Sequence, residues 1–201
     1  MRWQRRWAVL LAVGLLELAA GLAGCAAGGD MTRPERRLFP LDSATYADVV
    51  GRFGMPQASA ESVRDGVRIR TIWYAYTDSH AEPTREGIVP VRLLEYDFVG
   101  NNLVGQIFAS SFKSDSTEFD PTIARVVLKG VATSEEVATL IGRPSAFFLA
   151  PMVKAPAKTG VGYFEEPMRA GTGWTFRRSL TISFDENDHA LGVELTPPGG
   201  E

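Results

Sequence analysis

A short frame that occurs twice constrains the fold of this chain more than any other feature. The two copies are residues 45–56, TYADVVGRFGMP, and residues 133–144, TSEEVATLIGRP. Each begins with threonine, has an acidic residue three positions later, and ends on glycine, one further residue and proline. Threonine followed by that acid is typical of a helix start, and the glycine and proline are typical of a helix end. The frame therefore predicts two short helices with defined starts and stops.

Segments with period-two alternation follow each copy of the frame. The run 94–98, LEYDF, places its apolar residues on one side of a strand and Glu95 and Asp97 on the other. A Gly-Asn-Asn turn then leads into a returning apolar segment. The same order recurs over residues 180–195, with a polar turn between two alternating runs. This pattern predicts antiparallel hairpins after both helices.

The repeat predicts an α+β fold made of two tandem helix-plus-antiparallel-sheet units, at residues 43–116 and 126–197. We expect helices on one face of a largely antiparallel sheet structure, with both units sharing one core. The chain has one cysteine, so no disulfide can staple either unit, and a single unit of this size is marginal alone. A chance recurrence of a common cap-and-stop pattern is the alternative interpretation.

The N-terminus has the features of a bacterial lipoprotein signal. Three arginines among the first seven residues are followed by an apolar run that ends in Leu22-Ala23-Gly24-Cys25. That order predicts cleavage between Gly24 and Cys25 and lipidation of the sulfur. The run is shorter than the ~20 apolar residues that span a bilayer, and it contains Glu17, which argues against a transmembrane anchor. We expect a signal peptide at 1–24, a flexible tether at 25–42, and a membrane attachment through lipid on Cys25.

On these motifs the chain resembles the SmpA/OmlA (BamE-like) lipoproteins, and its repeated unit is similar to half of the β-lactamase inhibitor protein fold. The resemblance rests on the lipobox, on residues 129–144 and on the hairpin at 184–192. It implies acyl chains of the palmitate type on Cys25 and, with Ala26 rather than aspartate next, attachment to the outer membrane facing the periplasm. It also implies an accessory role in envelope assembly. The BamE-like lipoproteins have one such unit, whereas two are predicted here. Two units together favour a concave sheet face that binds another protein.

The sequence contains no motif for catalysis, a cofactor or a metal. His80 and His189 lack a spaced cysteine or histidine partner, and no nucleophile elbow or phosphate-binding glycine loop is present. The net charge of −3 argues against a nucleic-acid partner. We therefore expect no enzymatic activity, no cofactor and no metal. An enzyme of an unrecognised type would need His80 or His189 clustered with carboxylates.

Residues 151–173 are predicted to be irregular, although they carry apolar side chains among glycines and prolines. These side chains either fill the core or contact a partner. The candidate partner-binding residues are Met152, Val153, Tyr163, Phe164 and Met168.

The function predicted from the sequence is that of a membrane-anchored, protein-binding or scaffolding module in the envelope. The alternative is a periplasmic inhibitor of an envelope hydrolase. The identity of the partner and the oligomeric state do not follow from the sequence.

Overall fold

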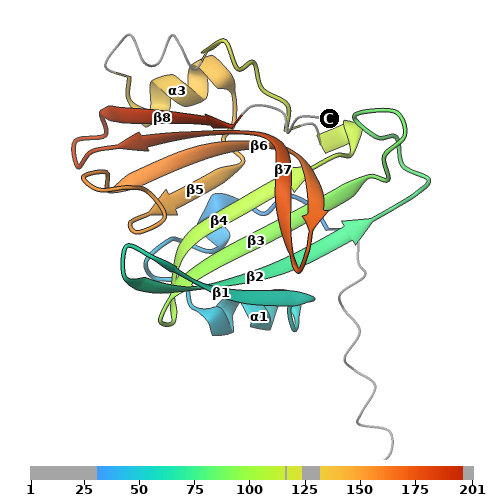
Figure 1. Cartoon of the computed structure of the whole chain (residues 1–201), viewed down its shortest axis with the longest axis horizontal. Helices are drawn as coiled ribbons and strands as arrows, with labels where there is room; N and C mark the ends of the chain where they lie inside the picture. The colour runs from blue at the N-terminus through green and yellow to red at the C-terminus, as the bar shows by residue number, and fades with distance from the viewer. Residues whose placement is uncertain (1–30, 116, 124–131, 197–201) are drawn as a thin grey trace, which may run out of the picture.

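The computed structural model describes residues 31–115, 117–123 and 132–196. In this part of the chain, eight antiparallel strands form one sheet and lie in sequence order, each beside its neighbour in the chain (Figure 1). The strands are β1 (Ala58–Arg64), β2 (Val67–Thr77), β3 (Val91–Val99), β4 (Asn102–Ser110), β5 (Ala146–Leu149), β6 (Thr159–Ala170), β7 (Gly173–Phe184) and β8 (Ala190–Thr196). Helix α1 (Tyr46–Phe53) precedes β1 and helix α3 (Ser134–Ile141) precedes β5. Single 3-10 turns occur at Arg36–Leu38 and Lys113–Asp115.

The prediction of two tandem helix-plus-sheet units is wrong. The structure has a single continuous sheet with two short helices, because β4 pairs directly with β5. Gly105, Gln106 and Ile107 lie opposite Phe148, Phe147 and Ala146 in this pairing. Unpaired strand edges are exposed rows of donors and acceptors, so joining the strands in one sheet removes two edges that separate sheets would leave open.

The predicted helix starts are confirmed in both copies of the frame. Thr45 accepts from the backbone N–H of Asp48, whose carboxylate accepts from the Thr45 N–H, and Thr133 and Glu136 repeat this capping box. Gly54 follows α1 with a φ of 80°, a conformation that glycine adopts without a Cβ clash. The helix boundaries therefore follow from local chemistry.

A tyrosine of the sheet holds the end of each helix. The Tyr74 hydroxyl on β2 donates to the Gly54 carbonyl at 2.8 Å, and the Tyr163 hydroxyl on β6 donates to the Gly142 carbonyl at 3.0 Å. These bonds satisfy carbonyl groups that a helix end leaves without a partner. They attach each helix to the second strand that follows it.

Both helices pack on the same face of the sheet, which we call the helix face. Tyr96, Gln106, Phe147 and Val161 lie opposite one another on successive strands from β3 to β6, so all four are on this face. The core below α1 contains Phe39, Val49, Ile72, Tyr74, Leu94, Tyr96, Phe98, Leu103 and Phe108. The core below α3 contains Phe119, Val137, Val161, Tyr163, Leu180, Ile182 and Phe184. Large apolar side chains thus fill the helix face.

The opposite face, which we call the inner face, combines a third apolar cluster, which includes Ile107, Phe148 and Phe164, with a row of mostly small residues. Pairing aligns Ala60, Thr71, Asp97, Gly105 and Phe148 in one row across the first five strands. The row continues through glycine on β6, where a Cβ at Gly160 would lie only 2.6 Å from Val153 Cγ1. The sheet bends toward this face, as the contacts between β1 and β7 show.

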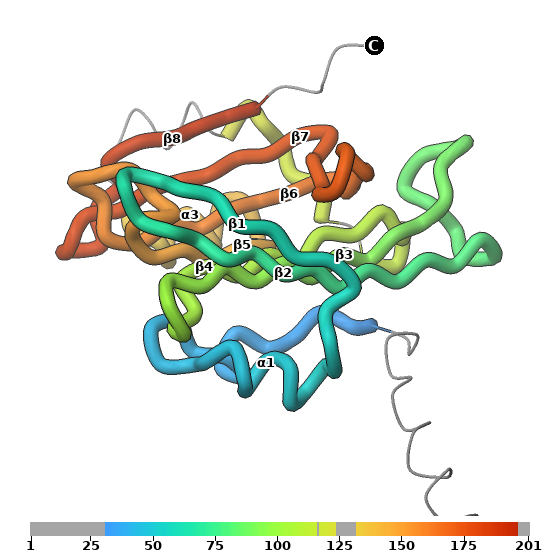
Figure 2. The backbone as a smooth tube through the Cα atoms, turned by 60° about the horizontal axis from the view of Figure 1, so that its bottom comes forward, coloured from blue at the N-terminus to red at the C-terminus, as the bar shows by residue number. Residues whose placement is uncertain are grey.

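The far end of the β6–β7 hairpin folds over the inner face, in front of β3 and β4 in Figure 1 and above β3 in Figure 2. A Cβ on Gly173 at its tip would lie 3.7 Å from the Trp73 ring. The bend lies at Glu166, whose φ is 43°, and the buried carboxylates of Glu165 and Glu166 pair there with Arg177. The hairpin therefore covers part of the inner face.

Candidate functional site

Two carboxylates lie close together on the inner face of β3. Glu95 and Asp97 lie two residues apart on one strand, so both point to the same side. Asp97 is 1 % exposed, whereas Glu95 is partly exposed. Buried carboxylates are costly unless their oxygens are bonded and their charge is compensated. We call Glu95 and Asp97 the acid pair.

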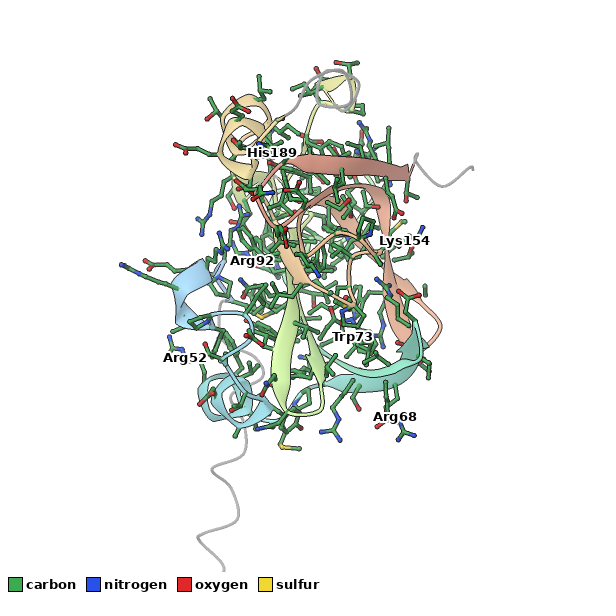
Figure 3. All side chains as sticks on the ribbon, turned by 90° about the vertical axis from the view of Figure 1, so that its left-hand side faces the viewer. Arg52, Arg68, Trp73, Arg92, Lys154 and His189 are labelled. Carbon is green, nitrogen blue, oxygen red and sulfur yellow. The ribbon has the colours of Figure 1, made fainter. Side chains whose placement is uncertain are left out.

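Strand β2 supplies one hydrogen-bond donor to each carboxylate. Trp73 Nε1 donates to Glu95 Oε2 at 2.6 Å, and Thr71 Oγ1 donates to Asp97 Oδ1 at 2.6 Å. The register explains both bonds, because Trp73 lies opposite Glu95 and Thr71 lies opposite Asp97. Figure 3 shows Trp73 inside the curl of the sheet rather than on its outer surface. The strand pairing therefore positions the pair.

The second oxygen of Asp97 has no hydrogen-bond partner among the described residues. Asp97 Oδ2 lies over Gly105 on β4, where a Cβ would approach it to 2.6 Å. The absence of a side chain at Gly105 is what gives this oxygen room. An acceptor buried without a partner costs about 1–3 kcal/mol, and more if it is charged.

Burial raises the pKa of both carboxyl groups. The pKa of Glu95 rises to about 8, mainly through burial and then through the nearby Asp97, while the Trp73 bond and Arg64 oppose the shift. The pKa of Asp97 rises to about 6 through burial, against the Thr71 bond and Arg64. Strongly perturbed carboxyl groups are candidates for a functional site.

Arg64, at the end of β1, is a positive charge that acts on both carboxyl groups. Its side chain is exposed, and its Nη1 donates to the Met152 carbonyl at 2.7 Å, so the guanidinium is also engaged by the β5–β6 loop. The charge of Arg64 lowers the pKa of both carboxyl groups by less than burial raises it. The acid pair therefore keeps an excess of negative charge whenever it is ionised.

The segment predicted to be irregular at 151–173 is a short loop followed by β6, so this structural expectation is wrong for most of its length. The alternation of β6 was hidden by its Gly-x-Gly start and by its proline. Val153, Tyr163 and Phe164 are buried in the core, which leaves Met152, partly exposed, and Met168, 37 % exposed, as candidates for contact with a partner. Cys25, Gly24 and the signal peptide lie outside the described residues.

The acid pair was not predicted as a site, because strand alternation places Glu95 and Asp97 on the side opposite the apolar residues but does not show whether that side is enclosed. One sequence signal pointed to enclosure. The same side of the neighbouring strands carries Trp73 and Gly105, which are unusual for an open polar surface.

Neither histidine lies in a metal-binding cluster, since no group of three or more His, Cys, Asp and Glu residues suited to a metal occurs in the described ranges. Among the helices that the structure describes, none has the length and apolarity needed to cross a membrane.

Comparison with known proteins provides little further information. No protein-family model matches the chain, and no curated protein matches it in sequence. A solved structure from Streptococcus mutans, titled a "putative beta-lactamase inhibitor protein", is similar over 77 % of this chain and 83 % of its own. The sequence identity is 12 % and the TM-score is 0.36, a level of similarity on which we base no argument.

Proposed function

We propose that this protein is a lipid-anchored binding protein of the bacterial envelope, and that its acid pair receives a cationic side chain of a protein partner. The observation that carries the proposal is Asp97 Oδ2, which is buried and without a hydrogen-bond partner in the described residues, beside the partly exposed Glu95 carboxylate. The two acids together present more negative charge than the described residues around them neutralise.

Electrostatics explains why a cation suits this position. Two carboxylates in a low-dielectric environment cannot both ionise unless a positive charge lies close by, so without one they retain protons. A lysine or arginine from a partner would supply that charge and a donor for Asp97 Oδ2. Charge-assisted bonds of this kind are about twice as strong as neutral ones.

The binding proposal also predicts a dependence on pH. The pair must lose its protons to pair with a cation, and the pKa of Glu95 is raised to about 8. Partner binding should therefore strengthen as the pH rises from 6 toward 8. An interface that uses only apolar contacts would not show this trend.

The anchoring part of the proposal is supported by the order of charge, apolar run and Leu22-Ala23-Gly24-Cys25 at the N-terminus. Within the tether predicted at 25–42, Met31 and Leu41 pack against the α1 core, so this part of the segment belongs to the folded protein. A short tether of this kind would hold the sheet near the outer-membrane surface, on the periplasmic side.

Site-specific photo-crosslinking in cells tests the binding proposal on the full chain. A photoreactive residue replaces Ala60, which lies on the inner face of β1 opposite Thr71, or Ser59, which points to the other side of the same strand. We expect a defined protein partner to crosslink from position 60 and not from position 59. The crosslink should fall at least tenfold when Glu95→Thr and Asp97→Ser remove the carboxylates.

A partner that crosslinks equally well with and without the carboxylates would contradict the role of the acid pair. If the partner is a hydrolase, measurement of its activity with and without the protein distinguishes an inhibitor from a scaffold. The anchor has a separate test. Cys25→Ser should move the protein out of the membrane fraction, and a variant that stays acylated or membrane-bound would contradict lipidation at Cys25.

A further inference from the structure

Residues 31–41, which we call the strap, cross the helix face between the core of α1 and the end of α3. Met31 and Leu41 pack against the α1 core. Between them, the Arg33 side chain donates to the carbonyl oxygens of Arg143 and Pro144, which follow α3. The strap therefore brings its arginines next to the arginine that ends the second copy of the helix frame.

Arg33, Arg36 and Arg143 line one small pocket on the helix face, together with Phe108 and Phe147. The Arg36 guanidinium lies 4.5 Å from the centre of the Phe147 ring, and that of Arg33 lies 5.7 Å from the centre of the Phe108 ring. A second cavity of about 580 Å³ lies beside this pocket and shares Arg36 and Phe147 with it. The pocket thus has an aromatic floor and a cationic rim.

None of these three arginines forms an ion pair with a carboxylate in the described residues. Their recorded partners are carbonyl oxygens and aromatic rings: Arg33 bonds to the carbonyls after α3, and Arg143 bonds to the Pro34 carbonyl at 3.5 Å. Arg37 on the same strap differs, because its Nε lies 2.5 Å from Glu35 Oε2. Within the described residues, Arg33, Arg36 and Arg143 therefore lack a neutralising carboxylate, whereas Arg37 on the same strap has one.

The proximity of these like charges is unfavourable without an anion. The pKa of Arg33 is lowered to about 10, first by burial and then by the charge of Arg143. Guanidinium groups present donors in a planar fork that matches the oxygens of phosphate. A tetrahedral oxyanion would neutralise the repulsion and accept from several of these donors at once.

We infer that the Arg33–Arg36–Arg143 pocket is a binding site for a phosphate group, either free phosphate or the phosphomonoester head of a lipid. This inference concerns the face opposite the acid pair and does not depend on the partner proposed there. Because the strap follows the proposed lipidated segment, a lipid source is within reach of the same surface. The experiment below separates the two sources.

The test measures the thermal midpoint of the full chain in neutral detergent micelles. One arm adds sodium phosphate against sodium chloride at equal ionic strength, and the other adds phosphatidic acid against phosphatidylcholine. We expect an increase of about 5–10 °C when the phosphate group is in hundredfold excess over its dissociation constant. ³¹P NMR line broadening provides a direct readout of binding in both arms.

The variant Arg36→Gln/Arg143→Gln should abolish the shift, and it should fold because both side chains are exposed. Arg52→Gln/Arg68→Gln is the matched control, with the same loss of charge at two exposed arginines elsewhere (Figure 3), and it should keep the full shift.

A shift with sodium phosphate alone identifies free phosphate as the ligand, and a shift with phosphatidic acid alone identifies a lipid head group. Shifts in both arms mean that the pocket accepts either source. No shift in either arm would overturn the inference, as would equal shifts in the two double variants.

Discussion

Strands β3 and β7 follow their helices in the same order and share one frame, yet they differ at the acid pair. Residues 94–98 read LEYDF and residues 180–184 read LTISF, and in both runs the apolar residues lie on the helix face. Each run has a register irregularity before its phenylalanine. A glycine lies opposite the fourth residue in each, Gly105 on β4 and Gly192 on β8.

The difference between the strands is chemical rather than architectural. Glu95 and Asp97 of β3 occupy the places that Thr181 and Ser183 take in β7. A Cβ on Gly105 would lie 2.6 Å from Asp97 Oδ2, whereas a Cβ on Gly192 would lie 3.5 Å from Ser183 Oγ. Since β7 forms the same strand with hydroxyl groups, the strand geometry does not require carboxylates, and this is why we assign the acid pair to binding.

The largest effect we expect is on the pH dependence of stability. The pKa of Glu95 rises from 4.5 to about 8 on folding, so the folded state holds this proton more tightly than the unfolded chain. Its contribution is fully favourable below pH 4.5 and is lost as the pH rises through 8. Glu95→Gln should therefore be more stable than the natural chain at pH 8, with the difference vanishing toward pH 4.5. Urea unfolding at a series of pH values measures this.

Thr181→Val, at the equivalent place on β7, is the control for that experiment and should leave the pH profile unchanged. A Glu95→Gln profile that runs parallel to that of the natural chain would show that the carboxyl group is not perturbed.

The next largest effect concerns the two glycines. Gly105→Ala should destabilise the protein by about 1–3 kcal/mol, because the new methyl group collides with Asp97 Oδ2. Gly192→Ala should change the stability by no more than about 0.5 kcal/mol, since its contact is ordinary. Adding Asp97→Ser to Gly105→Ala should recover most of the loss. Equal losses at the two glycines would remove the distinction between the strands.

The helix caps should behave alike in both copies of the frame. Thr45→Ala and Thr133→Ala each remove a capping-box bond and should each cost about 0.5–2 kcal/mol in unfolding free energy. Thermal unfolding of the two single variants compares them directly. A cost confined to one copy would mean that the two helices are not held in the same way.

The smallest effect should come from the tyrosines that hold the helix ends. Tyr74→Phe and Tyr163→Phe each remove one hydrogen bond to a helix-terminal glycine and should cost about 0.5–1.5 kcal/mol. Tyr96→Phe is the control, because its buried hydroxyl has no partner in the described residues, and it should be neutral or stabilising. A Tyr96→Phe loss as large as the other two would indicate a partner for that hydroxyl.

Much of the local structure could be predicted from the sequence because its causes are local. The caps at Thr45 and Thr133 need only residues within one helical turn. The hairpins at 94–108 and 180–195 need only alternation and turn residues. The side assigned to Glu95 and Asp97 was also right, since alternation decides it.

Other features depended on residues far apart in the chain. Alternation could not show that the side carrying the acid pair is enclosed, because the enclosure comes from the β6–β7 hairpin, which packs a glycine tip against Trp73. The arginine pocket likewise joins Arg33 to Arg143, more than a hundred residues later. Neither the contact of the hairpin with Trp73 nor that of Arg33 with Arg143 produces a regular pattern in the sequence that could predict it.

The sequence by itself determined where the helices start and stop, how the strands alternate, and which residues form the apolar side of the sheet. Only the tertiary structure decided that β4 pairs with β5 in one sheet, that this sheet curls over its inner face, and that the acid pair and the arginine pocket lie on opposite faces. The physical reason is range: capping and alternation act over a few residues, whereas curling and charge burial result from side chains that meet only after the whole sheet has closed.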